Sequence, residues 1–242
     1  MFFDPLYWMI FLVTMIITGL ASIKVKSAFS AGNKIRLTNS MTGAQAAQRI
    51  LNVTGIRDVK IVRSKGFLSD HYNPMNKTLA LSPDVYDGKT ASSVGVAAHE
   101  VGHAIQHAKG YGPLKLRSTL VPIASFGSRF GIILIIISML MQGAVQASGP
   151  SAGYSIGIAG LVLFSMAAVF SIVTVPVEFN ASARAKLLLK ETGIVHTSEE
   201  EAAVSRVLTA AGLTYVAAAL TAILQVLYWA IRLGLLGGRS RD

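Results

Sequence analysis

The chain has 242 residues, of which 52% are hydrophobic and 14% are charged, and its mean hydropathy is +0.54. A soluble protein covers its surface with more charge than this, so the composition excludes an ordinary soluble protein. The formal net charge is +10, but the basic residues are spread through loops beside long apolar runs and form no arginine-rich or aromatic-interleaved tract. That distribution indicates a membrane protein and argues against nucleic-acid binding. The absence of cysteine excludes disulfides and thiolate metal ligands.

Four apolar segments are long enough, or nearly so, to cross a hydrocarbon layer of about 30 Å. In chain order they cover residues 6–23, 130–147, 153–175 and 208–231. The first segment follows an acidic residue and is itself followed by four basic residues, which are Lys24, Lys26, Lys34 and Arg36. This polarity predicts a retained anchor whose C-terminal flank is cytoplasmic, and not a cleaved secretory leader.

The same orientation places residues 24–119 and 177–206 in the cytoplasm and the C-terminus outside. Three arginines in the tail oppose the usual excess of positive charge inside; they are Arg232, Arg239 and Arg241. Either the first spans dominate the orientation or the last apolar segment does not fully cross. We favour the first alternative.

Capping boxes predict two helix starts in the polar segments. Thr42 and Gln45 are spaced to cap a helix that runs to about residue 52, and Ser198 and Glu201 have the same spacing farther along the chain. Residues 59–62 and 78–82 are strand candidates joined by a loop.

The stretch HEVGH lies on a helix that Thr90 is expected to cap and that should run to about Ala108. His99 and His103 are four residues apart, so their side chains share one face with Cβ atoms about 5–6 Å apart and can converge on one metal ion. Glu100 points beside that ion, where its carboxylate can take a proton from an activated water. The alternative is a packed helix whose histidines bond to backbone or to each other.

A catalytic zinc site needs a third protein ligand, and the same helix does not supply it. His107 lies about 12 Å from His99 along the axis, at about 1.5 Å per residue. The metzincin pattern also fails, because Gln106 and Lys109 occupy its glycine and histidine positions. Glu178 is a candidate on the cytoplasmic side: it follows Pro176 at the expected start of a short helix. From residue chemistry alone, metal ligation and stabilisation by the helix dipole are equally good explanations of this glutamate.

The segments SDHYNPMNKTLALS, AAHEVGHAIQHAKGY and PVEFNASARA, together with the N-terminal span, occur in an order that resembles the bacterial YugP-type family of membrane zinc metallopeptidases. The resemblance covers nearly the whole chain. It implies a gluzincin-like site, with one zinc per chain held by His99, His103 and Glu178, a water as the fourth ligand, and Glu100 as general base. The segment VEFNAS is similar to the third-ligand helix of HtpX-type membrane proteases.

The chain departs from the gluzincin pattern near the third ligand. Gluzincins usually carry an aspartate four residues after the ligand glutamate, where it orients a zinc-bound histidine. Here that position is Ser182, with Asn180 nearby. A neutral partner polarises an imidazole less than a carboxylate does. If these two residues contact the zinc-bound histidines, the affinity for zinc or the basicity of its bound water is expected to be lower.

A strand at residues 78–82 sits where zincins place the edge strand above the active-site helix, and an exposed edge can bind a substrate backbone. Its residues are Thr78, Leu79, Ala80, Leu81 and Ser82. His71 precedes this strand and could stabilise an oxyanion, although a role in ordering the loop is the simpler explanation.

The expected fold class is mainly α: a polytopic membrane protein with about four transmembrane helices and a small zincin-like α+β cytosolic domain. The expected parts are an anchor (1–23), a catalytic domain (24–119), a transmembrane hairpin (120–176), a cytosolic helical segment (177–206), and a final span with its tail (207–242).

The expected function is hydrolysis of a peptide or unfolded protein by a multi-pass enzyme of the bacterial inner membrane, with its site on the cytoplasmic side. Two alternatives are a zinc-binding scaffold without activity and an intramembrane protease of the site-2 type. The second alternative is weakened by the charged flanks of HEVGH, by its shortage of bulky apolar residues and by the absence of a Leu-Asp-Gly motif.

Overall fold

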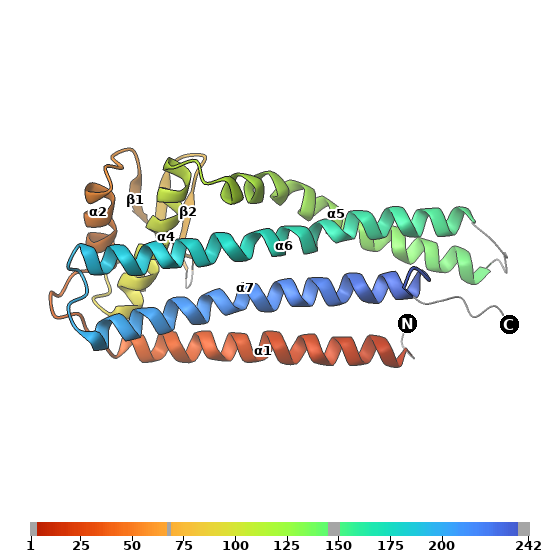
Figure 1. Cartoon of the computed structure of the whole chain (residues 1–242), viewed down its shortest axis with the longest axis horizontal. Helices are drawn as coiled ribbons and strands as arrows, with labels where there is room; N and C mark the ends of the chain where they lie inside the picture. The colour runs from red at the N-terminus through yellow and green to blue at the C-terminus, as the bar shows by residue number, and fades with distance from the viewer. Residues whose placement is uncertain (1–3, 67–68, 145–150, 237–242) are drawn as a thin grey trace. The chain divides into compact units, whose positions relative to one another are not determined.

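The computed structural model of the chain describes residues 4–66, 69–144 and 151–236, and it is mainly helical (Figure 1). The helices are α1 (Pro5–Asn33), α2 (Gly43–Val53), α3 (Pro83–Tyr86), α4 (Ala91–Ala108), α5 (Gly112–Ala144), α6 (Ala152–Glu191) and α7 (Ser198–Arg232). The strands are β1 (Lys60–Arg63), β2 (His71–Asn73) and β3 (Thr78–Leu81). The expected fold class is confirmed, because four of these helices are long and apolar enough to cross a membrane and a small sheet accompanies them.

The described residues form two compact units. Among these residues, the spanning unit comprises 4–19, 116–144, 151–174 and 215–236, and the mixed unit comprises 20–66, 69–115 and 175–214. The four long helices α1, α5, α6 and α7 each contribute residues to both units.

The spanning unit exposes apolar side chains on its outside, as a protein solvated by lipid should. Met9 and Leu140, for example, are 56% and 70% exposed. Inside the unit, Tyr228 of α7 donates a hydrogen bond to the Asp4 carboxylate at 3.0 Å, and Arg232 forms an ion pair with the same carboxylate at 3.4 Å. These contacts place the beginning of α1 beside the end of α7. The tail arginines Arg239 and Arg241 lie outside the described residues.

The mixed unit holds the sheet, and in it α2 packs against α4 over a core of small and branched side chains (Figure 1). The fully buried members include Ala46, Ile50, Val94, Ala97 and Val101. Small residues on α4 let the two helices approach closely, and α4 also contacts α3, β2 and β3.

The predicted N-terminal caps are confirmed at α2 and α4, and the cap predicted for α7 is wrong by one residue. The Thr42–Gln45 capping box is present at α2, and Thr90 caps α4 by accepting from the Ser93 N–H. At α7, however, the box is formed by Thr197 and Glu200 and not by Ser198 and Glu201. The buried carboxylate of Glu200 also accepts from the backbone N–H of His196, four residues earlier, and from that of Thr38, which is a tertiary contact and explains why Glu200 is selected.

The sheet has the order β1–β3–β2, so the predicted edge strand is wrong. β3 pairs in parallel with β1, from Lys60 opposite Thr78, and antiparallel with β2, where His71 lies opposite Ala80. Leu79 and Leu81 are fully buried in the core, which is why this strand occupies the centre. The segment 78–82 therefore offers no free edge to a substrate.

The fifth residue of that segment lies outside the strand. Ser82 is the N-cap of α3, and its backbone N–H donates to the Asp70 carboxylate at 2.7 Å.

Candidate metal centre

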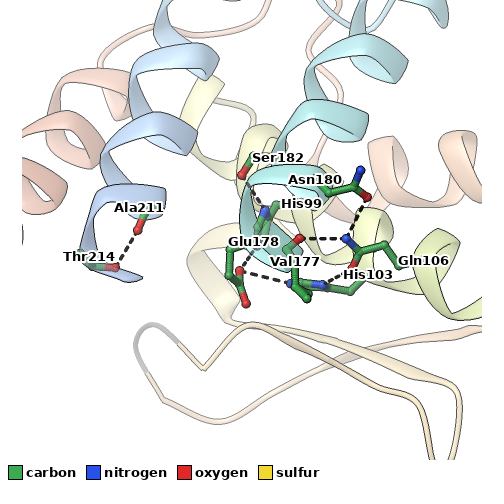
Figure 2. A network of polar contacts seen from close by, with 9 residues as sticks. All are labelled: His99, His103, Gln106, Val177, Glu178, Asn180, Ser182, Ala211 and Thr214. Atoms are coloured by element: carbon green, nitrogen blue, oxygen red, sulfur yellow. Dashed lines mark hydrogen bonds and ion pairs between the residues drawn. The ribbon is translucent and has the colours of Figure 1, made fainter. Parts of the chain in front are cut away.

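α4 carries two histidines on one face. The ring centroids of His99 and His103 are 4.8 Å apart, as the four-residue spacing predicts, and the two rings are nearly perpendicular. His103 is buried and His99 is slightly more exposed, with 10% and 13% of their side chains accessible. Both rings point toward α6 (Figure 2).

Glu178 lies in the interior of α6, and the prediction that it starts a short helix is wrong. α6 is continuous for 40 residues and contains Pro176. Proline is tolerated inside long apolar helices, because neighbouring groups satisfy the backbone that it frees. Glu178 is therefore not at a helix N-terminus, and the helix dipole does not explain its burial.

The three side chains meet around one carboxylate oxygen. Oε2 of Glu178 lies 3.1 Å from Nε2 of His99 and 3.4 Å from Nε2 of His103 (Figure 2). One potential ligand atom from each residue lies within 4.8 Å of the others, so the group could hold a metal ion. The Glu178 side chain is only 2% exposed. A buried carboxylate needs a partner of opposite charge, and this arrangement offers a place for a cation.

The carboxylates near His103 raise the pKa of its imidazole. Burial lowers the pKa of His103, but the hydrogen bond to Glu178 and the charges of Glu100 and Glu178 more than compensate, so its pKa lies above the ordinary value. The site thus attracts positive charge. Glu100 is 8% exposed and acts on His103 through its charge, yet it is not a member of the metal-ligating group formed by described residues.

Gly102 allows the two helices to come this close. A Cβ at position 102 would lie 2.6 Å from the Ala181 carbonyl oxygen and 3.1 Å from its Cα, and both are backbone atoms that cannot rotate away. The glycine inside HEVGH is therefore a packing requirement that fixes the separation between α4 and the turn of α6 that follows Glu178.

Substituting Gly102 with alanine should weaken metal binding and destabilise the protein by about 1–3 kcal/mol, as overpacking usually does. In an exposed helix the same change would stabilise by about 1 kcal/mol. The measurements are zinc content and thermal unfolding of the purified protein. Gly95→Ala on the same helix is the matched control, because the atom nearest to its Cβ would be a methyl group of Val204 at 3.4 Å, an ordinary contact. Equal zinc binding by both variants would contradict this account.

Two polar side chains contact the outer nitrogens of the histidines (Figure 2). Nδ1 of His99 lies 3.1 Å from the Ser182 hydroxyl, and Nδ1 of His103 lies 3.0 Å from Oε1 of Gln106. Asn180, which was expected near the histidines, is bonded to Gln106 at 3.0 Å instead. Ser182 thus contacts the candidate ligand His99 directly, whereas Asn180 reaches the candidate ligand His103 only through Gln106.

Three other histidines, His71, His107 and His196, lie outside this group. His71, on β2, is exposed, and its Nδ1 contacts the Ser69 carbonyl at 2.8 Å. Nδ1 of His107 contacts the Tyr72 hydroxyl at 2.9 Å, and His107 is not among the clustered ligand residues, as the spacing along α4 predicted.

Gln106 was not predicted to lie at this site. It was noted only as a departure from the metzincin pattern, although a glutamine that is three residues from a candidate ligand and lies among alanines and isoleucine is itself a signal. Its burial and its contacts with α6 could not be read from the sequence, because they join positions more than seventy residues apart.

α4 is not one of the four helices long and apolar enough to cross a membrane among the described residues. It belongs to the mixed unit, with α2 and the sheet.

Comparison with known proteins gives two matches. A family model described as "Putative neutral zinc metallopeptidase" matches residues 7–234. "Putative membrane protease YugP" of Bacillus subtilis (strain 168) is 42% identical over 207 residues, which cover 86% of this chain and 87% of that protein. No solved structure is significantly similar to the chain. Since the family model spans almost the entire sequence and the relative is similar over most of its length, the chain belongs to this family of zinc metallopeptidases.

Proposed function

We propose that the chain is an endopeptidase that uses one zinc ion, held by His99, His103 and Glu178, to hydrolyse loosely folded protein segments. The observation that carries this proposal is the convergence of two imidazole nitrogens on one buried carboxylate oxygen. Two nitrogens and one oxygen form a donor set used by catalytic zinc sites, which leave a further position open. The residues present therefore fit the ion that the family implies.

Zinc, when bound, lowers the pKa of a water molecule and polarises the carbonyl of the scissile bond. Glu100 is assigned as the general base. It follows His99 on α4, is mostly buried, and stands outside the group of potential ligands, so its carboxylate is available for proton transfer. In the proposed reaction Glu100 accepts a proton from the attacking water and passes it to the leaving amine.

The substrate backbone is assigned to the outer edge of β2, in place of the central strand β3. β2 is at the margin of the sheet and pairs with β3 along one side. Tyr72 of this strand contacts His107 of α4, so β2 lies against the helix that carries the histidines. An extended peptide can add to such an edge through main-chain hydrogen bonds.

The proposed location is the bacterial cell membrane, with the mixed unit on the cytoplasmic side. The basic residues after the first apolar segment support this orientation. Arg232, which opposes it, forms an ion pair with Asp4 at 3.4 Å. By analogy with HtpX-type proteases, the cellular role is removal of damaged membrane proteins.

Metal removal tests the proposed activity. The protein purified in detergent should cleave an unfolded probe such as β-casein, lose this activity after dialysis against a chelator, and recover it with about one equivalent of zinc per chain. Cleavage of β-casein is measured by the appearance of new peptide termini. Undiminished cleavage by protein shown to contain no metal would contradict the proposal.

A further inference from the structure

We infer that Gln106 is a positioning residue that fixes which nitrogen of His103 faces the metal and holds that histidine to the turn of α6 carrying Glu178. The inference rests on the proposed zinc site and adds a residue to it. Gln106 is fully buried, and its side chain makes three hydrogen bonds that reach both helices.

The orientation of the Gln106 amide is determined by its partners on α6. Its Nε2 lies 2.8 Å from the Val177 carbonyl oxygen, which can only accept, so this atom must be the NH2 group. The second partner is Oδ1 of Asn180, at 3.0 Å, and this oxygen also accepts from Nε of Arg184 at 2.8 Å. Both amides are thus oriented by groups whose hydrogen-bonding roles cannot be exchanged.

The orientation of the amide assigns the proton on His103. Oε1 of Gln106 faces Nδ1 of His103 at 3.0 Å, and an amide oxygen can only accept a hydrogen bond. Nδ1 therefore carries the hydrogen, and the lone pair of the neutral ring is on Nε2. That nitrogen faces Oε2 of Glu178 at 3.4 Å, so its lone pair is placed to bind a metal ion that the carboxylate also binds.

The other histidine has no comparable constraint. Its Nδ1 contacts the Ser182 hydroxyl, which can rotate and can either donate or accept. Gln106 therefore makes His103 different from His99. His103 has a single permitted tautomer, whereas either tautomer of His99 can bond to the Ser182 hydroxyl.

The same side chain joins the two helices at the site. Val177 immediately precedes Glu178 on α6, and Asn180 lies two residues after it. Because Gln106 bonds to residues on both sides of the glutamate, it ties the position of the carboxylate to that of His103. The chain of contacts ends at Arg184, whose guanidinium lies 6.0 Å from the centre of the Tyr111 ring.

Zinc affinity of Gln106→Leu tests the inference. Removing a partner that orients a metal-bound histidine typically weakens metal binding about 10–100-fold, and we expect a loss of this size in competition with a chromogenic chelator. With saturating cobalt in place of zinc, the visible absorption bands should also change, because the ligand geometry changes. Gln48→Leu is the matched control: Gln48 is exposed on α2, and the variant should bind both metals like the wild type.

A second variant and a measurement on the unmodified chain cover the case in which Gln106→Leu does not fold. Asn180→Ala removes one of the two donor contacts of Gln106 but leaves the contact to His103, so it should weaken zinc binding less than Gln106→Leu. In zinc-loaded wild-type protein with 15N-labelled histidine, His103 should show a hydrogen on Nδ1 and metal ligation through Nε2.

The outcomes separate this inference from the proposed function. Ligation of His103 through Nδ1, or wild-type zinc affinity in folded Gln106→Leu, would overturn the role of Gln106 while leaving the zinc site in place. Failure of the wild-type protein to bind zinc would overturn the proposed function itself, and the inference with it.

Discussion

Glu100→Gln is expected to abolish peptide hydrolysis while the protein retains its zinc. The amide has nearly the same shape as the carboxylate but cannot accept a proton, and general base catalysis commonly contributes a factor of about 10²–10⁴ to the rate. Zinc should remain because Glu100 is outside the group formed by His99, His103 and Glu178. The measurements are the cleavage rate with β-casein at saturating zinc and the zinc content of the same sample.

The matched control is Glu199→Gln, which makes the same chemical change at an exposed position in the first turn of α7. It should leave both the rate and the zinc content unchanged. Wild-type activity in Glu100→Gln would show that another group is the base. A wild-type protein that binds zinc and cleaves no tested substrate would instead favour the scaffold without activity.

Glu178→Ala is expected to remove most of the zinc that the wild-type protein carries, which should be about one ion per chain. The variant keeps both histidines but loses the oxygen on which they converge, and two imidazoles alone do not complete a three-ligand site. Metal analysis after gel filtration in detergent measures the difference. Activity should be lost in parallel.

Glu191→Ala, at the exposed C-terminal end of α6, is the control for loss of a carboxylate from the same helix. Thermal unfolding of both variants against metal-free wild type distinguishes loss of a ligand from loss of the fold. Full zinc content in folded Glu178→Ala would show that the third ligand lies elsewhere and that the resemblance misleads at this residue.

The helix with HEVGH could be predicted because its signals are local. A cap at Thr90 and a histidine pair four residues apart depend only on neighbouring positions and on the helical repeat. The signal for a membrane span is equally local, since a run of about twenty apolar residues is long enough to cross the hydrocarbon layer. The spans and the two histidines were therefore accessible from the sequence.

The errors all concern properties that the neighbouring residues do not decide. β2 has only three residues, and strand order depends on pairing between distant segments, so β3 was wrongly placed at the edge. The start assigned to the helix at Glu178 relied on Pro176, whose usual effect is overridden inside a long apolar helix. The capping box at α7 lies one residue earlier than predicted because Glu200 has a distant backbone partner, Thr38.

The sequence by itself determined the membrane segments, the face of α4 that carries His99 and His103, and, through a family resemblance, Glu178 as the residue to join them. The tertiary structure decided how closely Glu178 approaches the two histidines, because α4 and α6 are in backbone contact at Gly102. It also brought Gln106 into the site. The physical reason is the distance along the sequence over which each kind of interaction acts. Helical periodicity and hydropathy act between neighbours, whereas hydrogen-bond partners and close backbone contacts between helices exist only after the chain has folded.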